Sequence, residues 1–438
     1  MSDRPAVPTR LWGNLAGLTT RGRSLLAGGL ALGVCSVLLG QRDLLRAAVF
    51  LIALPVAAVT IVARTRYRLA CTRRIDPVRV EAGRSATVRL TLDNVSRLPS
   101  GVLLMEDALP YTLGARPRFV LDRVEPQGRR EVSYPVSSQV RGRYRVGPLS
   151  VRLTDPFGLC ELTRSFAGVD GLIVTPVVSP LPPVRLGGDW AGGGAAARSV
   201  ATSGSDDIAT REYRHGDGLR KVHWRSTARR GELMVRQEEQ PVQSRATVLL
   251  DGRTGAHRGP GPGSSFEWAV SAVASIGIGL ARSGLSMSVL RETGDPLTPP
   301  GLPLTEGVLL DTLASAAMSD TGRLDAVASR LRSGSGGGGG VLVAVLGRLD
   351  LAEAEQLARW RPGTGVCVAV VLDTDSWAPG GPKARALARE QHEAVVTLLD
   401  RAGWRVLPIT HGTTLASVWP RAGGPTSRVP SGLGAGQP

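Results

Sequence analysis

The sequence predicts a multidomain chain: a hairpin of two transmembrane helices, then an antiparallel β-sandwich, then an α/β domain with a mostly parallel sheet. Three observations predict this order. Two uncharged apolar runs occupy residues 24–40 and 47–63. Apolar and polar residues alternate over 75–165, and over 245–420 short apolar runs alternate with helical patterns.

The two apolar runs define the transmembrane hairpin, residues 24–63. Each run is near the shortest length that spans a bilayer, and flanking residues can extend it. Only the segment from Gln41 to Arg46 separates them. A pair of buried core helices and a cleaved signal peptide are the alternatives. The basic flanks argue against buried core helices. A cleaved signal peptide is disfavoured because the second apolar run follows the first at once.

The positive charge of the chain is concentrated around this hairpin. Residues 1–74 carry 11 arginines and two aspartates, a net charge of about +9 within a total of +16. Arginine-rich flanks on both sides of the hairpin place the N-terminal tail, residues 1–23, and the main body in the cytoplasm. We therefore expect a multi-pass protein of the cell (inner) membrane with the lipid bilayer as partner, and we do not expect nucleic-acid binding.

The cysteines and the segments between domains complete the outline. Four scattered cysteines without a C-x-x-C pair indicate a reducing compartment, with no disulfide framework or zinc site. Short alternating strands and turn residues over 75–165 predict an immunoglobulin-like sandwich. Residues 180–205, rich in Pro, Gly, Ala and Ser, predict a flexible linker, and residues 421–438 a disordered tail.

The most distinctive segment is 206–240. Gly216-Asp217 predicts a turn whose Asp217 caps a helix, and Gly231 can end that helix. The segment contains the pattern R-E-Y-R-x-G-D-x-x-R-x-V-H-W-x-x-x-A-R followed by E-L-x-V-R-x-x-E. The residues taken as its signature are Arg211, Tyr213, Gly216, Asp217, Arg220, His223, Trp224, Arg225, Ala228, Arg229, Arg230, Leu233 and Arg236.

This pattern resembles the signature of the bacterial domain-of-unknown-function 58 family. Upstream, the motifs at 142–149 and 155–159 resemble the same family's sandwich. The resemblance implies a von Willebrand factor A-like α/β domain downstream. It also implies a MoxR-type AAA+ ATPase as partner, and often a transglutaminase-like membrane protein. It supplies no catalytic residues.

Two interpretations of the signature segment remain open. It is either a buried network that joins the sandwich to the α/β domain or a docking surface for a partner. We expect burial for Asp217 and Trp224 and docking for Arg229 and Arg230. His215 and His223 lack an obvious nucleophile nearby, so catalysis there is not expected.

The α/β domain carries candidate acidic sites. The resemblance to the von Willebrand A fold suggests a metal site of the type Asp-x-Ser-x-Ser, which here reads Asp251, Arg253 and Gly255. The site is therefore degenerate, with the Arg253 guanidinium able to pair with Asp251 in place of a cation, and we expect no metal and no cofactor. Asp373-Thr374-Asp375 follows a later strand and resembles a phosphoryl-transfer motif, although a solvated loop is the simpler account.

Together these features predict a membrane-anchored, non-enzymatic adaptor working with an AAA+ ATPase. The ATPase partnership rests on family analogy alone. Two alternatives are a hydrolase or phosphatase that uses Asp251 or Asp373, and a metal-dependent adhesion module.

Overall fold

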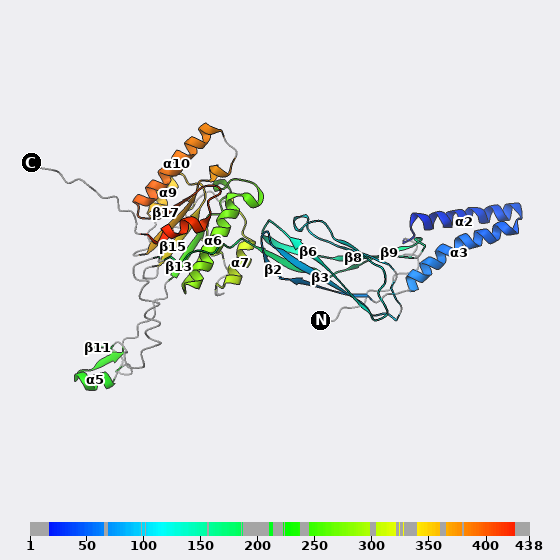
Figure 1. The fold of residues 1–438 in the computed structure, drawn as a ribbon, viewed down its shortest axis with the longest axis horizontal. Helices are drawn as coiled ribbons and strands as arrows, with labels where there is room; N and C mark the ends of the chain where they lie inside the picture. The colour runs from blue at the N-terminus through cyan, green and yellow to red at the C-terminus, as the bar shows by residue number, and fades with distance from the viewer. Residues whose placement is uncertain are drawn as a thin grey trace, which may run out of the picture. The chain divides into compact units, whose positions relative to one another are not determined.

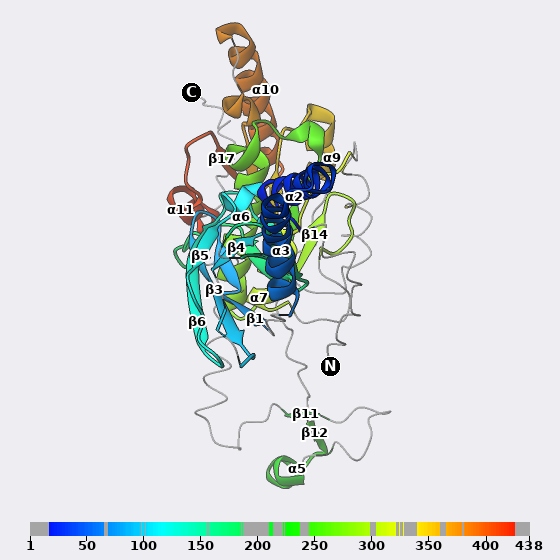
Figure 2. The same cartoon turned by 90° about the vertical axis from the view of Figure 1, so that its right-hand side faces the viewer.

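The computed structural model divides into two compact units, Met1–Thr175 and Pro176–Pro438. It describes residues 17–64, 69–97, 99–100, 102–155, 157–184, 186, 210–212, 222, 224–236, 245–297, 304–320, 324, 327, 340–359, 365–378 and 381–424. Figures 1 and 2 show the chain from two directions.

The first unit begins with the predicted pair of apolar helices, α2 (Thr20–Leu39) and α3 (Arg42–Arg64). Both are long and apolar enough to cross a membrane, by length and composition. Small residues spaced seven apart on α2 are buried: Gly22, Gly29 and Ser36. A Cβ on Gly29 would lie only 2.8 Å from Cγ1 of Ile52 on α3, so glycine permits this close approach of the two helices.

Ten short strands follow the helices. They are β1 (Leu69–Asp76), β2 (Arg79–Glu81), β3 (Ser85–Asn94), β4 (Leu103–Asp107), β5 (Arg118–Leu121), β6 (Arg129–Ser137), β7 (Gly142–Val146), β8 (Leu149–Thr154), β9 (Glu161–Phe166) and β10 (Asp170–Thr175). They form sheets of order β1-β3-β6, β2-β10-β7 and β5-β4-β8-β9. The strands therefore extend beyond the predicted bounds of 75–165 at both ends.

The strands pair mostly as the alternating pattern predicts. On β3, the apolar residues Ala86, Val88, Leu90 and Leu92 are buried while their neighbours along the strand are more exposed. All strand pairs of this unit are antiparallel among the described residues except β10 with β2, which run parallel. That pair joins residues about a hundred positions apart, so local periodicity does not predict it. The immunoglobulin-like classification stays a prediction.

The second unit contains a five-stranded parallel sheet of order β14-β13-β15-β16-β17. Its strands are β13 (Arg245–Leu250), β14 (Ser286–Arg291), β15 (Val341–Leu346), β16 (Val366–Leu372) and β17 (Arg405–Ile409). Its helices are α6 (Ser265–Arg282), α7 (Glu306–Ala314), α9 (Leu351–Ala358), α10 (Pro382–Arg401) and α11 (Leu415–Val418). The predicted parallel α/β arrangement is confirmed.

Helices cover both faces of this sheet. On β13, Val248 packs into one apolar core with residues of α6 and α7, such as Val273 and Leu309. The next residue, Leu249, points to the opposite face and packs with residues of α9 and α10. Continuous apolar strands such as β15, which is buried at all six positions, are what such a doubly covered sheet requires.

The start of the predicted linker is not a free linker. Leu181 and Val184 pack against the core of the α/β unit, and Leu186 is part of it. Apolar side chains spaced along a proline-rich stretch can lie on a helix surface without forming regular structure. The prediction of a flexible linker is therefore wrong for residues 180–184 and 186. Its remaining residues, 185 and 187–205, and the predicted tail beyond residue 424 lie outside the described residues.

Candidate functional site

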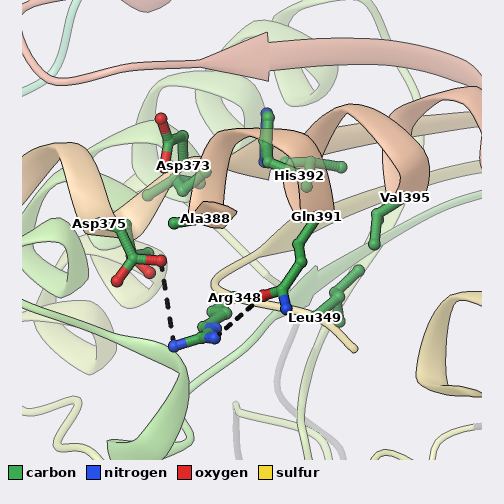
Figure 3. Close-up of a pocket in the computed structure, with 11 residues that line it drawn as sticks. Arg348, Leu349, Asp373, Asp375, Ala388, Gln391, His392 and Val395 are labelled. Carbon is green, nitrogen blue, oxygen red and sulfur yellow. Dashed lines mark hydrogen bonds and ion pairs between the residues drawn. The ribbon is translucent and has the colours of Figure 1, made fainter. Parts of the chain in front are cut away.

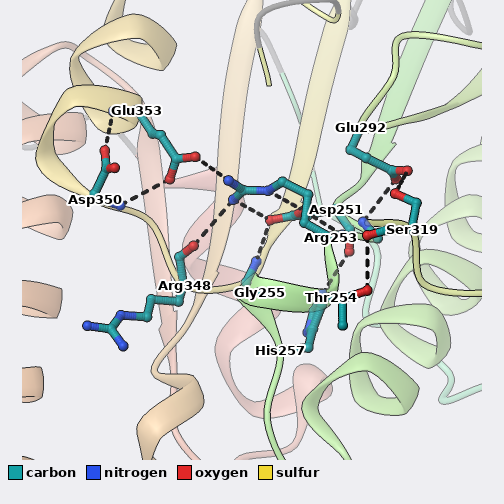
Figure 4. A network of polar contacts seen from close by, with 12 residues as sticks. Asp251, Arg253, Thr254, Gly255, His257, Glu292, Ser319, Arg348, Asp350 and Glu353 are labelled. Atoms are coloured by element: carbon teal, nitrogen blue, oxygen red, sulfur yellow. Dashed lines mark hydrogen bonds and ion pairs between the residues drawn. The ribbon is translucent and has the colours of Figure 1, made fainter. Parts of the chain in front are cut away.

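The carboxyl edge of the parallel sheet gathers the candidate acidic residues. In a sheet of this order the strand sequence reverses beside the first strand, and ligands of such folds bind outside the carboxyl ends of the strands there. Asp251 follows β13, Glu292 follows β14 and Gly347 follows β15. Figure 4 shows that Asp251 and Glu292 lie close together at this edge.

The carboxylate of Asp251 is fully hydrogen-bonded. The Arg253 side chain donates from Nε to Oδ1 and from Nη2 to Oδ2, each at 2.9 Å. The backbone N–H of Arg253 donates to Oδ1 at 3.2 Å, and that of Gly347 to Oδ2 at 3.1 Å. A carboxylate accepts about four hydrogen bonds, so Asp251 has no free lone pair directed at a substrate or cation.

Arg253 is held from a second side as well. Its Nη1 forms an ion pair with Glu353, whose helix α9 begins with a capping box between Asp350 and Glu353. Its Nη2 also donates to the carbonyl of Arg348 at 3.3 Å. Burial alone would lower the pKa of the Arg253 guanidinium, but its hydrogen bonds and charge attraction with Asp251 and Glu353 raise that pKa above its ordinary value. A permanent cation therefore occupies the centre of the degenerate site.

The neighbouring polar groups at this edge are also paired. Glu292 is buried and accepts the Gly252 N–H at 3.0 Å and the Ser319 hydroxyl. His257 is buried, with Nε2 2.8 Å from the Asp251 carbonyl and Nδ1 3.1 Å from Ser265 Oγ. Burial lowers the pKa of His257 below its ordinary value. This edge is a closed polar network, and its geometry suits rigidity better than general acid or base chemistry.

Among the described residues, no group of three or more His, Cys, Asp or Glu side chains is placed to hold a metal ion. At the predicted degenerate site, the Arg253–Asp251 pair forms as expected. Gly255 contributes no ligand side chain. The geometry of these residues does not fit a bound cation, because a guanidinium already neutralises the buried carboxylate.

A second group of polar residues lies farther along the same edge, after β16. Asp373, Asp375, Arg348, Gln391 and His392 surround a cavity of about 20 Å³ (Figure 3). Arg348 pairs with Asp375 at 3.9 Å and donates to Gln391 at 3.2 Å. The cavity has room for about one water molecule, which is too little for an organic substrate.

Two buried polar atoms of this cavity have no hydrogen-bond partner in the part of the chain that the structure describes: Oγ1 of Thr374 and Nε2 of His392. Burial lowers the pKa of His392, while the charges of Asp373 and Glu393 oppose that shift. The phosphoryl-transfer interpretation of Asp373 and Asp375 stays a prediction.

The signature segment is described at 210–212, 222 and 224–236. β11 (Thr210–Glu212) pairs antiparallel with β12 (Met234–Arg236), and α5 (Trp224–Arg230) precedes β12. The Thr227 hydroxyl accepts the Met234 N–H at 3.0 Å, which ties the helix to the hairpin. Gly231 ends α5 as predicted, with φ of +78° and its N–H donating to the Thr227 carbonyl.

Trp224 is exposed, which corrects one expectation. Its relative accessibility is 68%, so the prediction that its large apolar ring is buried is wrong. A seven-residue helix beside a two-stranded hairpin offers too little surface to cover an indole. Arg229 and Arg230 are exposed at the end of α5, as expected for docking residues. Ala228 and Leu233 are exposed too, whereas Val222 and Met234 of the same segment are buried.

The remaining signature residues are placed only in part. Arg211 lies on β11 and Arg236 on β12, the two strands that pair with each other. Arg225 lies on α5. Tyr213, His215, Gly216, Asp217, Arg220 and His223 lie outside the described residues.

Sequence reasoning missed most of the network around Asp251. Glu353, Glu292, His257 and Ser319 were not singled out, although all contribute to it. One signal was available, because acidic residues follow three of the apolar strands, and the carboxyl ends of parallel strands meet at one edge. Glu353 had no such signal, since it lies 100 residues from Arg253.

The fold and these sites define a class: a chain with a pair of apolar helices, a β-rich unit and a parallel α/β unit whose acidic edge is closed by its own arginine. Residues 209–307, from β11 to the start of α7, match the family described as protein of unknown function DUF58. This match supports the resemblance of the signature segment to the DUF58 family.

A relative with a similar sequence is known from Bacillus subtilis (strain 168), the uncharacterized protein YeaD. It is 27% identical over 234 residues, which cover 50% of this chain and 56% of YeaD. The match thus spans little more than half of the relative's length.

The likeness of this chain to the following two solved structures is faint. The CARDB domain of the PF1109 protein from Pyrococcus furiosus, in complex with di-metal ions, is 13% identical with a TM-score of 0.19, over 26% of this chain and 90% of that one. A complex of Zinc 2-glycoprotein with prolactin inducible protein, from human seminal plasma, is 10% identical with a TM-score of 0.20. The match covers 25% of this chain and 97% of that one. At such scores these likenesses carry no argument.

Proposed function

We propose that this chain is a membrane-anchored, non-enzymatic adaptor that binds a partner protein through its signature segment. The observation that carries the proposal is the exposed Trp224 on α5, with Arg229 and Arg230 exposed in the last turn of the same helix. Tryptophan and arginine are the residues most enriched at the energetic centres of protein interfaces. A large exposed apolar ring between charged residues is typical of such a centre.

The partner is a MoxR-type AAA+ ATPase, by analogy with the family that the signature resembles. A transglutaminase-like membrane protein is a further candidate of the same kind. The excess of exposed arginine on α5 suits an acidic surface on the partner, because complementary charge speeds association and fixes orientation. A neighbouring gene for an AAA+ ATPase would support this assignment.

The anchor is the helix pair α2–α3, spanning the cell membrane with both termini and the main body in the cytoplasm. Large apolar side chains cover its outer surface: Leu30, Val34, Val37, Leu38, Leu39, Leu45, Val49, Phe50 and Val56 are exposed. A soluble protein rarely leaves so large an apolar surface uncovered, whereas lipid tails cover it at no cost. The arginine-rich flanks support the cytoplasmic orientation.

In this proposal the α/β unit is a von Willebrand A-like module that has lost its metal chemistry. The saturated Asp251 and the buried Arg253 support a structural role for the acidic edge, and they weigh against a hydrolase built on Asp251. They weigh equally against metal-dependent adhesion, since the cation position holds a guanidinium.

Co-purification tests the proposal. The full-length protein, extracted from membranes in mild detergent, should retain the ATPase, and Trp224→Ala or Arg230→Ala should reduce the retained ATPase at least tenfold. Leu387→Ala is the matched control, because Leu387 is also an exposed apolar residue on a helix, α10, away from the signature. Equal retention by wild type and Trp224→Ala would contradict docking through this segment.

A further inference from the structure

A loop of the β-rich unit, residues 155–160 between β8 and β9, is built against the base of the helix pair. The backbone N–H of Thr19, the residue that caps α2, donates to the Leu159 carbonyl at 3.0 Å. The Thr19 hydroxyl donates to the Gly158 carbonyl at 2.7 Å. The Glu161 N–H donates back to the Gly17 carbonyl at 2.7 Å. Three hydrogen bonds thus join Gly17 and Thr19, just before α2, to the end of the loop and the first residue of β9.

Apolar contacts also hold the loop against the two helices. Leu159 and Cys160 are buried in a small cluster with Ala58 of α3, against which Leu25 and Val59 also pack. Val59 lies four residues inside the end of the apolar run 47–63, which corresponds to about 6 Å along a helix. If the helices span a bilayer, the loop therefore lies at the boundary between hydrocarbon and headgroups.

Hydrogen bonds within the loop accompany one large apolar side chain that is exposed. The buried carboxylate of Asp155 accepts the N–H of Phe157 at 3.0 Å and that of Cys160 at 2.5 Å. Gly158 has a φ of +67°, which glycine adopts without strain, and its N–H donates to the Asp155 carbonyl. On this framework Phe157 is 63% exposed. Among the residues of this unit that the structure describes, packing leaves most of the Phe157 ring uncovered.

Positive charge lies beside the exposed ring. Arg21 and Arg23 are exposed on the first turn of α2. A Cβ placed on Gly158 would lie 4.0 Å from Nη1 of Arg21, so that guanidinium is next to the loop. Guanidinium groups bind phosphate oxygens, and aromatic or apolar rings are favoured in the adjacent interfacial layer.

We propose that loop 155–160 is a membrane-contacting loop that inserts Phe157 among lipid headgroups, with Arg21 and Arg23 binding the phosphates of anionic lipids. The loop would then set the orientation of the β-rich unit at the bilayer surface, rather than leaving that unit tethered only through residues 65–68. This inference rests on the membrane anchoring proposed above, and it is independent of the ATPase partner.

Photocrosslinking in vesicles tests the inference. The full-length protein is reconstituted in equimolar phosphatidylcholine and phosphatidylglycerol with the photoreactive amino acid p-benzoylphenylalanine replacing one aromatic residue at a time. Phe157 is the test position. Phe50, 66% exposed on α3, reports on the anchor. Tyr111, 92% exposed, lies beyond Asp107, whose strand partner Leu149 starts β8, so it is at the opposite end of that strand from the loop.

Mass spectrometry of the irradiated protein should find phospholipid adducts at positions 50 and 157 and at least tenfold fewer at 111. Adducts at 50 with none at 157 would overturn the membrane-contacting loop and leave the anchor in place. Absence of adducts at both positions would overturn the anchor as well. A protein–protein crosslink from position 157 would replace the bilayer by a second protein chain, and it too would overturn the inference.

The arginines make a second, separable claim. Adducts at 157 should contain phosphatidylglycerol in at least threefold excess over phosphatidylcholine. The variant Arg21→Gln with Arg23→Gln should bring that ratio close to one, while adducts at position 50, near the opposite end of the run, should keep their ratio. An unbiased ratio in the wild type would overturn the role given to these arginines.

Discussion

Arg253 binds the carboxylate of Asp251 through two parallel hydrogen bonds of 2.9 Å, although only one residue separates them. Both side chains are buried at the carboxyl edge of the sheet. Further contacts to Gly347 and Glu353 make this pair a structural joint between β13, β15 and α9.

Removing the arginine should therefore destabilise the α/β unit strongly. Arg253→Ala leaves the Asp251 carboxylate buried without its counter-charge, which typically costs about 3–5 kcal/mol of unfolding free energy. The exposed pair of Arg282 and Glu306 provides the control, since Arg282→Ala should lower the free energy of unfolding far less. Thermal unfolding, with hydrogen exchange of the β13 and β15 amides as a local probe, measures both. Similar losses in the two variants would contradict the buried joint.

Because Arg253 already neutralises Asp251, we expect divalent cations not to change the stability of the protein. Millimolar Mg²⁺ should leave the melting temperature of the wild type unchanged, because a ligand stabilises only what it binds. Arg253→Ser is the informative comparison, as it returns a hydroxyl to the position and removes the competing guanidinium. A dose-dependent rise in the wild type that Asp251→Ala abolishes would refute the closed site.

Acid should weaken the unit through its buried histidine. Burial lowers the pKa of His257 in the folded state below 6.5, with Arg253 and Arg258 acting in the same direction. The unfolded chain then binds a proton that the folded chain resists, so the stability contributed by neutral His257 is present above pH 6.5. It is lost as pH falls from there through the depressed folded-state pKa. The melting temperature, measured between pH 8 and pH 5, should begin to fall once the pH drops below 6.5.

His257→Gln is the variant that isolates this effect. It should lower stability at neutral pH, because the bonds to the Asp251 carbonyl and Ser265 hydroxyl are disturbed. It should also reduce the fall of the melting temperature between pH 6.5 and pH 5, which is called the acid slope below. His392 has a pKa lowered by burial as well, so the slope that remains should shrink further in His257→Gln with His392→Gln. A slope that neither substitution changes would assign the acid sensitivity to carboxylates elsewhere.

These outcomes also show what could be inferred from sequence. The parallel sheet was predicted, because short apolar runs such as VLVAVL at 341–346 alternate with helical patterns. The Asp251–Arg253 pair was predicted because its partners are near neighbours. Glu353 was missed because a contact across 100 residues depends on the register of β13 and β15, which periodicity does not encode. Trp224 was misjudged because residue type was taken as a guide to burial.

Topology gives a further prediction. A reporter enzyme that is active only outside the cytoplasm should be silent when joined after Ala63 and active when joined after Gly40, between the two helices. The reason is that arginines flank both outer ends of the helix pair, and basic flanks remain inside. The reverse pattern would place the main body outside and remove its access to a cytoplasmic ATPase.

Trp404 and Trp224 differ in burial, so their substitution should affect stability differently. Trp404 is 1% exposed and packs in the core formed with α10, so Trp404→Ala should cost about 3–5 kcal/mol through lost burial and the cavity left behind. Trp224 packs against little, so Trp224→Ala should change stability by no more than about 0.5 kcal/mol. Thermal unfolding of the two variants beside the wild type measures the difference. A large loss in Trp224→Ala would mean that the indole is covered within the folded chain, and the signature segment would then be an internal joint whose partner is the protein itself.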